Sequence, residues 1–190
     1  MTNTAYTSAT AMSFEYSYNS SSSSRTDEVK AIKVSALRYL ARREYSRVEL
    51  YRRLSQKFSA ANEIQAVLDE LRDQGYQSDA RFTESFIRAK VSAGNGPFKI
   101  KIELREKGIC ESTALAAFDR QAIDWLAIAQ LVKDKRFGNT EVKAEAESAG
   151  EIMTEEEKLY LMAKKTRYLK NKGFYKEHVD IVLKSSVSSF

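Results

Sequence analysis

The side chains that could support catalysis or bind a metal are few in this sequence. It contains one histidine, His178, and one cysteine, Cys110, whereas zinc sites ordinarily use several such ligands together. It also lacks a Gly-Lys-Ser/Thr run at the spacing of a phosphate-binding loop. Carboxylate pairs such as Glu103 and Glu106 are typical of a solvated helix face. We therefore expect no catalytic residue, no metal and no cofactor, and we interpret His178 and Cys110 as structural residues.

Basic side chains are the other candidates, because they occur in blocks. The net charge of +5 conceals basic segments at 29–76 (+4), 77–136 (+3) and 158–190 (+6). It also conceals acidic segments at 1–28 (−2) and 137–157 (−6). Such blocks indicate a polyanionic partner or an acidic protein surface.

The composition limits the class of protein that can carry these charges. Hydrophobic residues make up 43% of 190 residues, enough for a core, and charged residues make up 30%. No apolar run reaches the roughly 18–20 residues of a membrane span, and one cysteine excludes a disulfide framework. These features favour a cytoplasmic protein. Residues 1–28, rich in Ser and Thr, lack the pattern of a signal peptide, and we expect them to form a disordered tail.

Apolar residues recur at helical spacing from residue 29 onward, which predicts an all-α protein. Gly96-Pro97 predicts a helix start, because proline suits the first helical position. Capping boxes predict two further starts, at Ser46 with Glu49 and at Thr154 with Glu157. Glycines predict three helix ends, at Gly75, Gly108 and Gly173. Trp125 is interpreted as a core or intermodule anchor.

The helical pattern also repeats. The equivalent positions are Leu54, Leu104 and Leu169, then Lys57, Lys107 and Lys172, and in the next helix Ile64, Ala114 and Val179. The third copy follows at a longer spacing, which an exposed, mobile acidic linker at 138–154 explains. Repetition of this kind predicts tandem three-helix modules at 29–76, 77–119 and 120–186, with the linker inserted in the third.

Several ordered motifs resemble those of the RecX family of recombinase regulators. They are LRYLARREYS at 37–46, LRDQGY at 71–76, DARF at 79–82, GPFKIKIELREKGI at 96–109 and LKNKGF at 169–174. The resemblance covers about residues 29–186. Two departures are mild: Gln77-Ser78 stands where the family often has Leu-Asp, and Lys172 replaces a common arginine.

The resemblance implies an all-helical, non-enzymatic protein with three tandem three-helix modules in an elongated, curved arrangement. Proteins of this family lie along the groove of the RecA–DNA filament. They inhibit ATP hydrolysis and strand exchange and favour filament disassembly. The implied partner is therefore the RecA filament, and the implied setting is DNA repair, recombination and the SOS response.

The candidate contact residues are basic positions on the predicted helices. They are Arg42, Arg43, Arg53, Lys57, Arg81, Arg88, Lys99, Lys101, Arg105, Lys107, Lys165, Arg167, Lys170 and Lys172. A basic helix face is often only solvated, but the repeated lysine favours a contact stripe. Two other functions stay open: a direct DNA-binding protein whose modules resemble helix-turn-helix units, and a helical scaffold unrelated to DNA. We expect a monomer that binds neither a membrane nor a small-molecule substrate.

Overall fold

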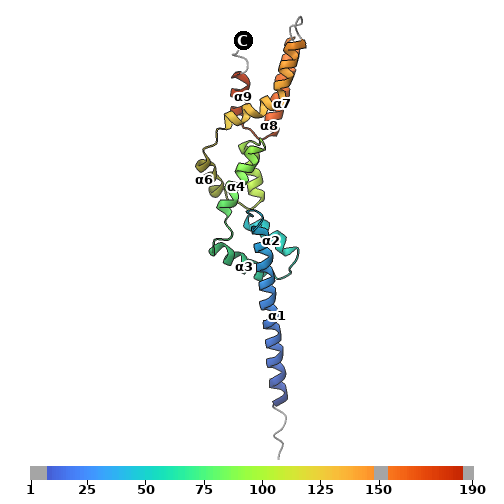
Figure 1. Ribbon diagram of the computed structural model, residues 1–190, viewed down its shortest axis with the longest axis vertical. Helices are drawn as coiled ribbons and strands as arrows, with labels where there is room; N and C mark the ends of the chain where they lie inside the picture. The colour runs from blue at the N-terminus through green and yellow to red at the C-terminus, as the bar shows by residue number, and fades with distance from the viewer. Residues whose placement is uncertain (1–7, 148–153, 186–190) are drawn as a thin grey trace, which may run out of the picture. The chain divides into compact units, whose positions relative to one another are not determined.

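The computed structural model describes residues 8–147 and 154–185, and every regular element in these ranges is an α-helix (Figure 1). The all-α prediction is confirmed. The helices are α1 (Ser8–Leu40), α2 (Arg47–Ser55), α3 (Ala61–Asp73), α4 (Asp79–Ser92), α5 (Pro97–Glu106), α6 (Glu111–Gln121), α7 (Trp125–Glu147), α8 (Glu155–Asn171) and α9 (Lys176–Ser185). The chain divides into two compact units after Ser78. Within the described residues, no helix is both long and apolar enough to cross a membrane.

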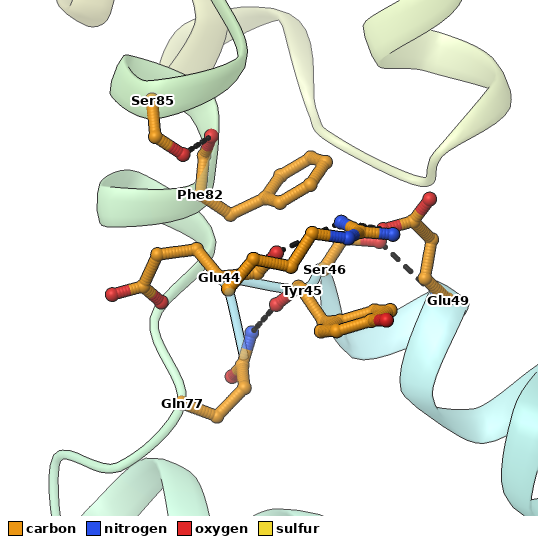
Figure 2. Close-up of polar contacts among 8 residues, drawn as sticks. Glu44, Tyr45, Ser46, Glu49, Gln77, Phe82 and Ser85 are labelled. Carbon is orange, nitrogen blue, oxygen red and sulfur yellow. Dashed lines mark hydrogen bonds and ion pairs between the residues drawn. The ribbon is translucent and has the colours of Figure 1, made fainter. Parts of the chain in front are cut away.

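The first unit contains α1, α2 and α3 around one hydrophobic core. The core residues are Ile32, Ala36, Tyr45, Leu50, Leu54, Ile64, Val67, Leu68 and Leu71. Ser46 caps α2 as predicted, because its hydroxyl accepts a hydrogen bond from the Glu49 backbone N–H at 3.1 Å. The side chain of Gln77 is buried and donates to the backbone carbonyl of Tyr45 at 3.2 Å (Figure 2). This residue, one of the departures from the family pattern, therefore ties the end of the unit to the α1–α2 connection.

Helix α1 differs from the sequence-based expectation, because it begins at Ser8 and not near Val29. The predicted disordered tail at 1–28 is thus helical from residue 8 onward, while residues 1–7 lie outside the described part. No glycine or proline interrupts residues 8–40, and serine lowers helix stability only modestly. Arg25 also forms an ion pair with Glu63 of α3 at 2.6 Å, which holds this part of α1 against the unit.

The second unit contains two cores. Helices α4, α5 and α6 enclose the first, which includes Phe82, Ile87, Ile100 and Leu104. Helices α7, α8 and α9 enclose the second, which includes Leu169, Phe174, Val179 and Val182. Trp125, at the start of α7, packs against both cores, and its ring meets Phe118 edge-on at 5.8 Å between centroids. Its interpretation as an anchor is confirmed.

Helix α7 also extends further than predicted. It continues to Glu147, so residues 138–147 are helical where an irregular acidic linker was expected. Alanine, glutamate and lysine dominate this stretch and are strong helix formers. The rest of the predicted linker, residues 148–153, lies outside the described residues. The capping box at Thr154 and Glu157 is confirmed and begins α8.

The repeated positions are equivalent in burial. Leu54, Leu104 and Leu169 are all 0% exposed. The helix that follows each of them buries the aligned residues Ile64, Ala114 and Val179. Each predicted glycine stop has a positive φ, 75° at Gly75, 78° at Gly108 and 89° at Gly173, a conformation that glycine adopts without a Cβ penalty. The pattern read from the sequence therefore marks the buried positions of three successive helix triplets.

Candidate interaction surface

Most of the predicted contact residues lie on the surface. The exposed ones are Arg42, Arg43, Arg53, Lys57, Arg81, Arg88, Lys99, Arg105, Arg167 and Lys170. Lys101, Lys107 and Lys172 are half-buried. The exception is Lys165, which is only 8% exposed. As a candidate contact residue Lys165 was expected at the surface, and this expectation is wrong: it lies one helical turn before the fully buried Leu169, on the same face of α8.

In the first unit, three of these cations gather around a pair of tyrosines. The rings of Tyr39 and Tyr45 lie 5.8 Å apart. The guanidinium of Arg43 lies 3.6 Å from the centre of the Tyr45 ring, and that of Arg53 lies within 5.5 Å of both ring centres. The ammonium of Lys57 lies 5.3 Å from the Tyr39 ring. Ring faces attract cations, so the tyrosines hold positive charges together that would otherwise repel one another.

Arg43 makes the closest cation–ring contact of this group. Its Nη1 donates to the Glu44 carbonyl at 2.9 Å and to the Glu49 carboxylate at 3.3 Å. With the Tyr45 ring beneath it, the guanidinium is fixed in one place. A cation fixed in this way loses less side-chain entropy when it binds a partner than a freely rotating lysine does.

The repeated lysine has an aromatic neighbour in every triplet. Lys107 of the second triplet lies 5.6 Å from the Phe86 ring, and Lys172 of the third lies 5.9 Å from the Tyr168 ring. Tyr168 in turn meets Phe137 edge-on at 5.5 Å. No pattern in the sequence predicted these aromatic neighbours. Their distances from the lysine along the chain differ between triplets, so alignment of the repeat could not have found them.

The Gly-Pro signature makes a contact that helix-start reasoning did not predict. Gly96 and Pro97 begin α5 as expected. In addition, the Gly96 N–H donates to the Lys172 carbonyl at 2.7 Å, and the Phe98 N–H donates to the Gly173 carbonyl at 3.0 Å. The start of α5 is thus joined by backbone hydrogen bonds to the α8–α9 turn. We call this contact, formed by residues 96–98 and 172–173, the glycine junction.

The junction sets the relative position of the repeated lysines in the second unit. Both Lys107, at the end of α5, and Lys172, within the junction, belong to elements that it connects. Phe98 extends the contact, since its ring meets that of Tyr175 at 6.0 Å. Gly96 and Gly173, which the sequence marks as a helix start and a helix end, therefore also influence where Lys107 and Lys172 lie.

The contacts of His178 and Cys110 come from residues near them in the sequence. The His178 ring packs near Phe174 and Tyr175. Cys110 is exposed at the N-terminal cap of α6. Hydrogen bonds from Ser112 and Thr113 lower the pKa of its thiol from 9.0 to about 7. Among the described residues, no cluster of His, Cys, Asp and Glu is arranged to hold a metal.

These features define an all-helical protein made of successive helix triplets with cations over aromatic rings. Residues 33–71 match the first three-helix domain of RecX, and residues 78–117 match the second. The chain belongs to the RecX family of regulatory proteins.

Named relatives and solved structures agree with this assignment. The chain is 40% identical over 144 residues to Regulatory protein RecX of Chromohalobacter salexigens, covering 76% of this chain and 85% of the relative. It is 34% identical over 156 residues to Regulatory protein RecX of Legionella pneumophila, covering 82% and 95%. The crystal structure of RecX from Lactobacillus salivarius has a similar fold, with a TM-score of 0.68, 21% identity and coverage of 84% and 97%.

Proposed function

We propose that the protein regulates the RecA recombinase as an inhibitor. It binds in the groove of the RecA–DNA filament in the cytoplasm and suppresses ATP hydrolysis, strand exchange and the recombinational and SOS activity that depend on them. The observation that carries this proposal is the match to both three-helix domains of a family whose relatives are named regulatory proteins. The protein acts by binding and not by catalysis.

The repeated cation gives this proposal a physical basis. One exposed or half-buried lysine per triplet, at positions 57, 107 and 172, offers several weak contacts to a partner that is itself a repeating polymer. Each contact raises the effective concentration of the next, so modest individual affinities combine into tight binding. A protein that bridges neighbouring filament subunits in this way would oppose the motions needed for ATP turnover.

The test uses RecA assembled on single-stranded DNA, with ATP turnover and strand exchange as readouts. Added protein should reduce both at or below one molecule per RecA subunit. A combined Lys101→Glu, Arg105→Glu, Lys107→Glu variant should lose most of this inhibition while circular dichroism shows that it remains helical.

A matched control separates a specific surface from total charge. Lys135, Lys176 and Lys184 are exposed and lie outside the candidate set, so changing all three to glutamate alters the net charge equally. This control should inhibit as strongly as the unmodified protein. Equal loss in both variants would contradict a contact at the candidate residues, and unchanged RecA activity at saturating protein would contradict the proposal itself.

Direct DNA binding is the alternative function, and the cation group around Tyr39 and Tyr45 favours it. In that case phosphate contacts would dominate, and affinity for naked DNA would fall steeply as salt rises. Titration of labelled single- and double-stranded DNA with the protein at several salt concentrations distinguishes direct DNA binding from regulation of RecA. Weak naked-DNA binding at physiological salt, together with strong filament binding, would assign the main role to the protein partner.

A further inference from the structure

The short connection between α1 and α2 carries the ring that supports Arg43. Glu44 and Tyr45 lie outside both helices, so the regular hydrogen bonds of a helix do not hold their backbone. Tyr45 is nevertheless only 6% exposed, and its ring centre lies 3.6 Å from the Arg43 guanidinium. The place of this guanidinium therefore depends on what holds the connection.

Gln77, at the C-terminal end of the first unit, holds the connection through its side chain (Figure 2). Its Nε2 donates to the Tyr45 carbonyl oxygen at 3.2 Å, and the residue is only 3% exposed. Its own backbone N–H donates to the carbonyl of Leu71, in the last turn of α3, at 3.1 Å. A buried amide is costly unless it is hydrogen-bonded. Gln77 thus fixes the Tyr45 backbone to the end of α3.

Arg43 remains accessible to a partner while it is held in this way. Its side chain is 47% exposed. Its hydrogen bonds to the Glu44 carbonyl and to the Glu49 carboxylate both leave from Nη1, whereas a guanidinium has five N–H donors. Other donors of the same group can therefore reach a carboxylate or a phosphate without breaking the contacts that orient it.

We propose that Gln77 is a positioning residue for the contact that Arg43 makes with the partner. By holding the Tyr45 carbonyl, Gln77 keeps the Tyr45 ring and the adjacent Glu44 carbonyl where both meet the guanidinium. Without this hydrogen bond the connection gains freedom, and Arg43 has to be ordered when the partner binds. Gln77 is itself buried, so it acts on binding through Arg43. The inference rests on the proposed function, because its binding readout is the inhibition of RecA.

The first measurement contains neither RecA nor DNA. In an NMR spectrum of the full chain, the Tyr45 ring should shift the side-chain protons of Arg43 upfield, and Arg43→Ala identifies these signals by their loss. Gln77→Met keeps the length of the side chain but removes its donor. In this variant the Arg43 signals should move toward those of an unstacked arginine. Unchanged signals would overturn the proposal.

The second measurement is the inhibition of ATP turnover by RecA on single-stranded DNA. Gln77→Met should raise the half-inhibitory concentration by about two- to tenfold, the factor that corresponds to ordering one long side chain. Arg43→Ala should raise it by at least as much. The double variant should inhibit about as well as Arg43→Ala alone, because the guanidinium that Gln77 positions is already gone.

This double-mutant comparison separates positioning from stability. Ile32→Val removes one methylene group from the fully buried core of the same unit, and it should lower stability without changing the half-inhibitory concentration. Circular dichroism checks the fold of each variant, and Gln77→Leu, which also lacks a donor, is the second choice if Gln77→Met does not fold.

Two results with RecA would count against the positioning role. Additive losses from Gln77→Met and Arg43→Ala would show that Gln77 does not act through Arg43. Full inhibition by Arg43→Ala would show that Arg43 makes no contact with the filament. An unmodified protein that does not inhibit RecA would instead contradict the proposed function, and the NMR comparison would still decide whether Gln77 positions Arg43.

Discussion

A β-carbon added to Gly96 would lie 2.4 Å from the carbonyl carbon of Gly173. The two residues are far apart in the sequence, one in the α4–α5 turn and the other in the α8–α9 turn. The two backbones can approach this closely because neither residue has a side chain. A β-carbon on Gly173 would also be too close to its neighbours, since it would lie 2.7 Å from the Lys99 backbone nitrogen. The glycine junction is thus a backbone-to-backbone contact that any larger residue would push apart.

Gly96→Ala should therefore destabilise the protein. The added methyl meets backbone atoms that cannot rotate away, and overpacking of this kind costs about 1–3 kcal/mol. Gly138→Ala is the control, because a β-carbon there has no neighbour within 4 Å and position 138 lies within α7. Alanine in a helix interior should stabilise by roughly 0.5–1 kcal/mol. Urea unfolding of both variants measures the two opposite changes, and equal stability of Gly96→Ala and the unmodified protein would contradict the junction.

Replacing the repeated lysines by methionine should separate their charge from their packing. Methionine retains an apolar stem over Tyr39, Phe86 or Tyr168 but removes the cation. Each of Lys57→Met, Lys107→Met and Lys172→Met should cost about 0.5–1 kcal/mol of stability, the size of an exposed cation–π interaction. Thermal unfolding measures these changes. Lys184→Met, at an exposed lysine of α9 outside the candidate set, serves as control and should change stability less than any of the three.

The same variants also test the proposed multivalent contact with RecA. Each single substitution should weaken inhibition of ATP turnover modestly, and the triple substitution should weaken it far more. If the triple variant and the unmodified protein give the same inhibition curve, these three lysines do not contact RecA.

The thiol of Cys110 should react at a lower pH than an ordinary cysteine. Hydrogen bonds from Ser112 and Thr113 lower its pKa to about 7, and the thiolate is the nucleophilic form. The rate of alkylation by iodoacetamide should therefore reach half its maximum near pH 7. Ser112→Ala should shift this midpoint upward, and the chain unfolded in urea should show the ordinary thiol value. An identical midpoint for the folded and unfolded chains would contradict the hydrogen-bonded arrangement.

The ion pair between Lys33 of α1 and Glu70 of α3 should make part of the stability depend on pH. Lys33 donates to Glu70 at 2.6 Å, and this hydrogen bond lowers the pKa of the Glu70 carboxyl below 4.5. A carboxyl with a lowered folded-state pKa stabilises the folded protein above its unfolded pKa, and this contribution disappears as the pH falls through the folded value. Glu70→Gln should thus reduce stability near neutral pH.

The measurement for this pair is urea unfolding across the acid range. The difference between Glu70→Gln and the unmodified protein should shrink as the pH falls below 4.5. Lys33→Met should behave in the same way, because it removes the other partner. If the difference in unfolding free energy between each variant and the unmodified protein stays constant down to strong acid, the charge of the pair contributes nothing to stability.

The sequence predicted the parts of the fold that depend on local pattern. The buried leucines at 54, 104 and 169 followed from helical spacing and from the repeat. The cap at Thr154 and the stop at Gly108 followed from residue type alone. These features depend on interactions within a few residues, so one sequence suffices to find them.

Features that depend on distant contacts were missed. Lys165 resembles its basic neighbours in sequence, and only the packing of α8 shows that it is buried. Arg25, which lies in the predicted tail, forms an ion pair with Glu63 in another helix, and no local signal reports this pair. The glycine junction was hidden for the same reason, because both of its glycines already had sufficient local explanations as helix boundaries.

Trp125 has a consequence for how the second unit unfolds. Its half-buried side chain packs against both cores of that unit, so opening either core removes a contact of the other. The second and third triplets should therefore lose their structure in a single cooperative transition, and amide hydrogens of α4–α6 and α7–α9 should exchange with similar protection. The side chain interpreted from the sequence as a core or intermodule anchor would thus set the size of a folding unit.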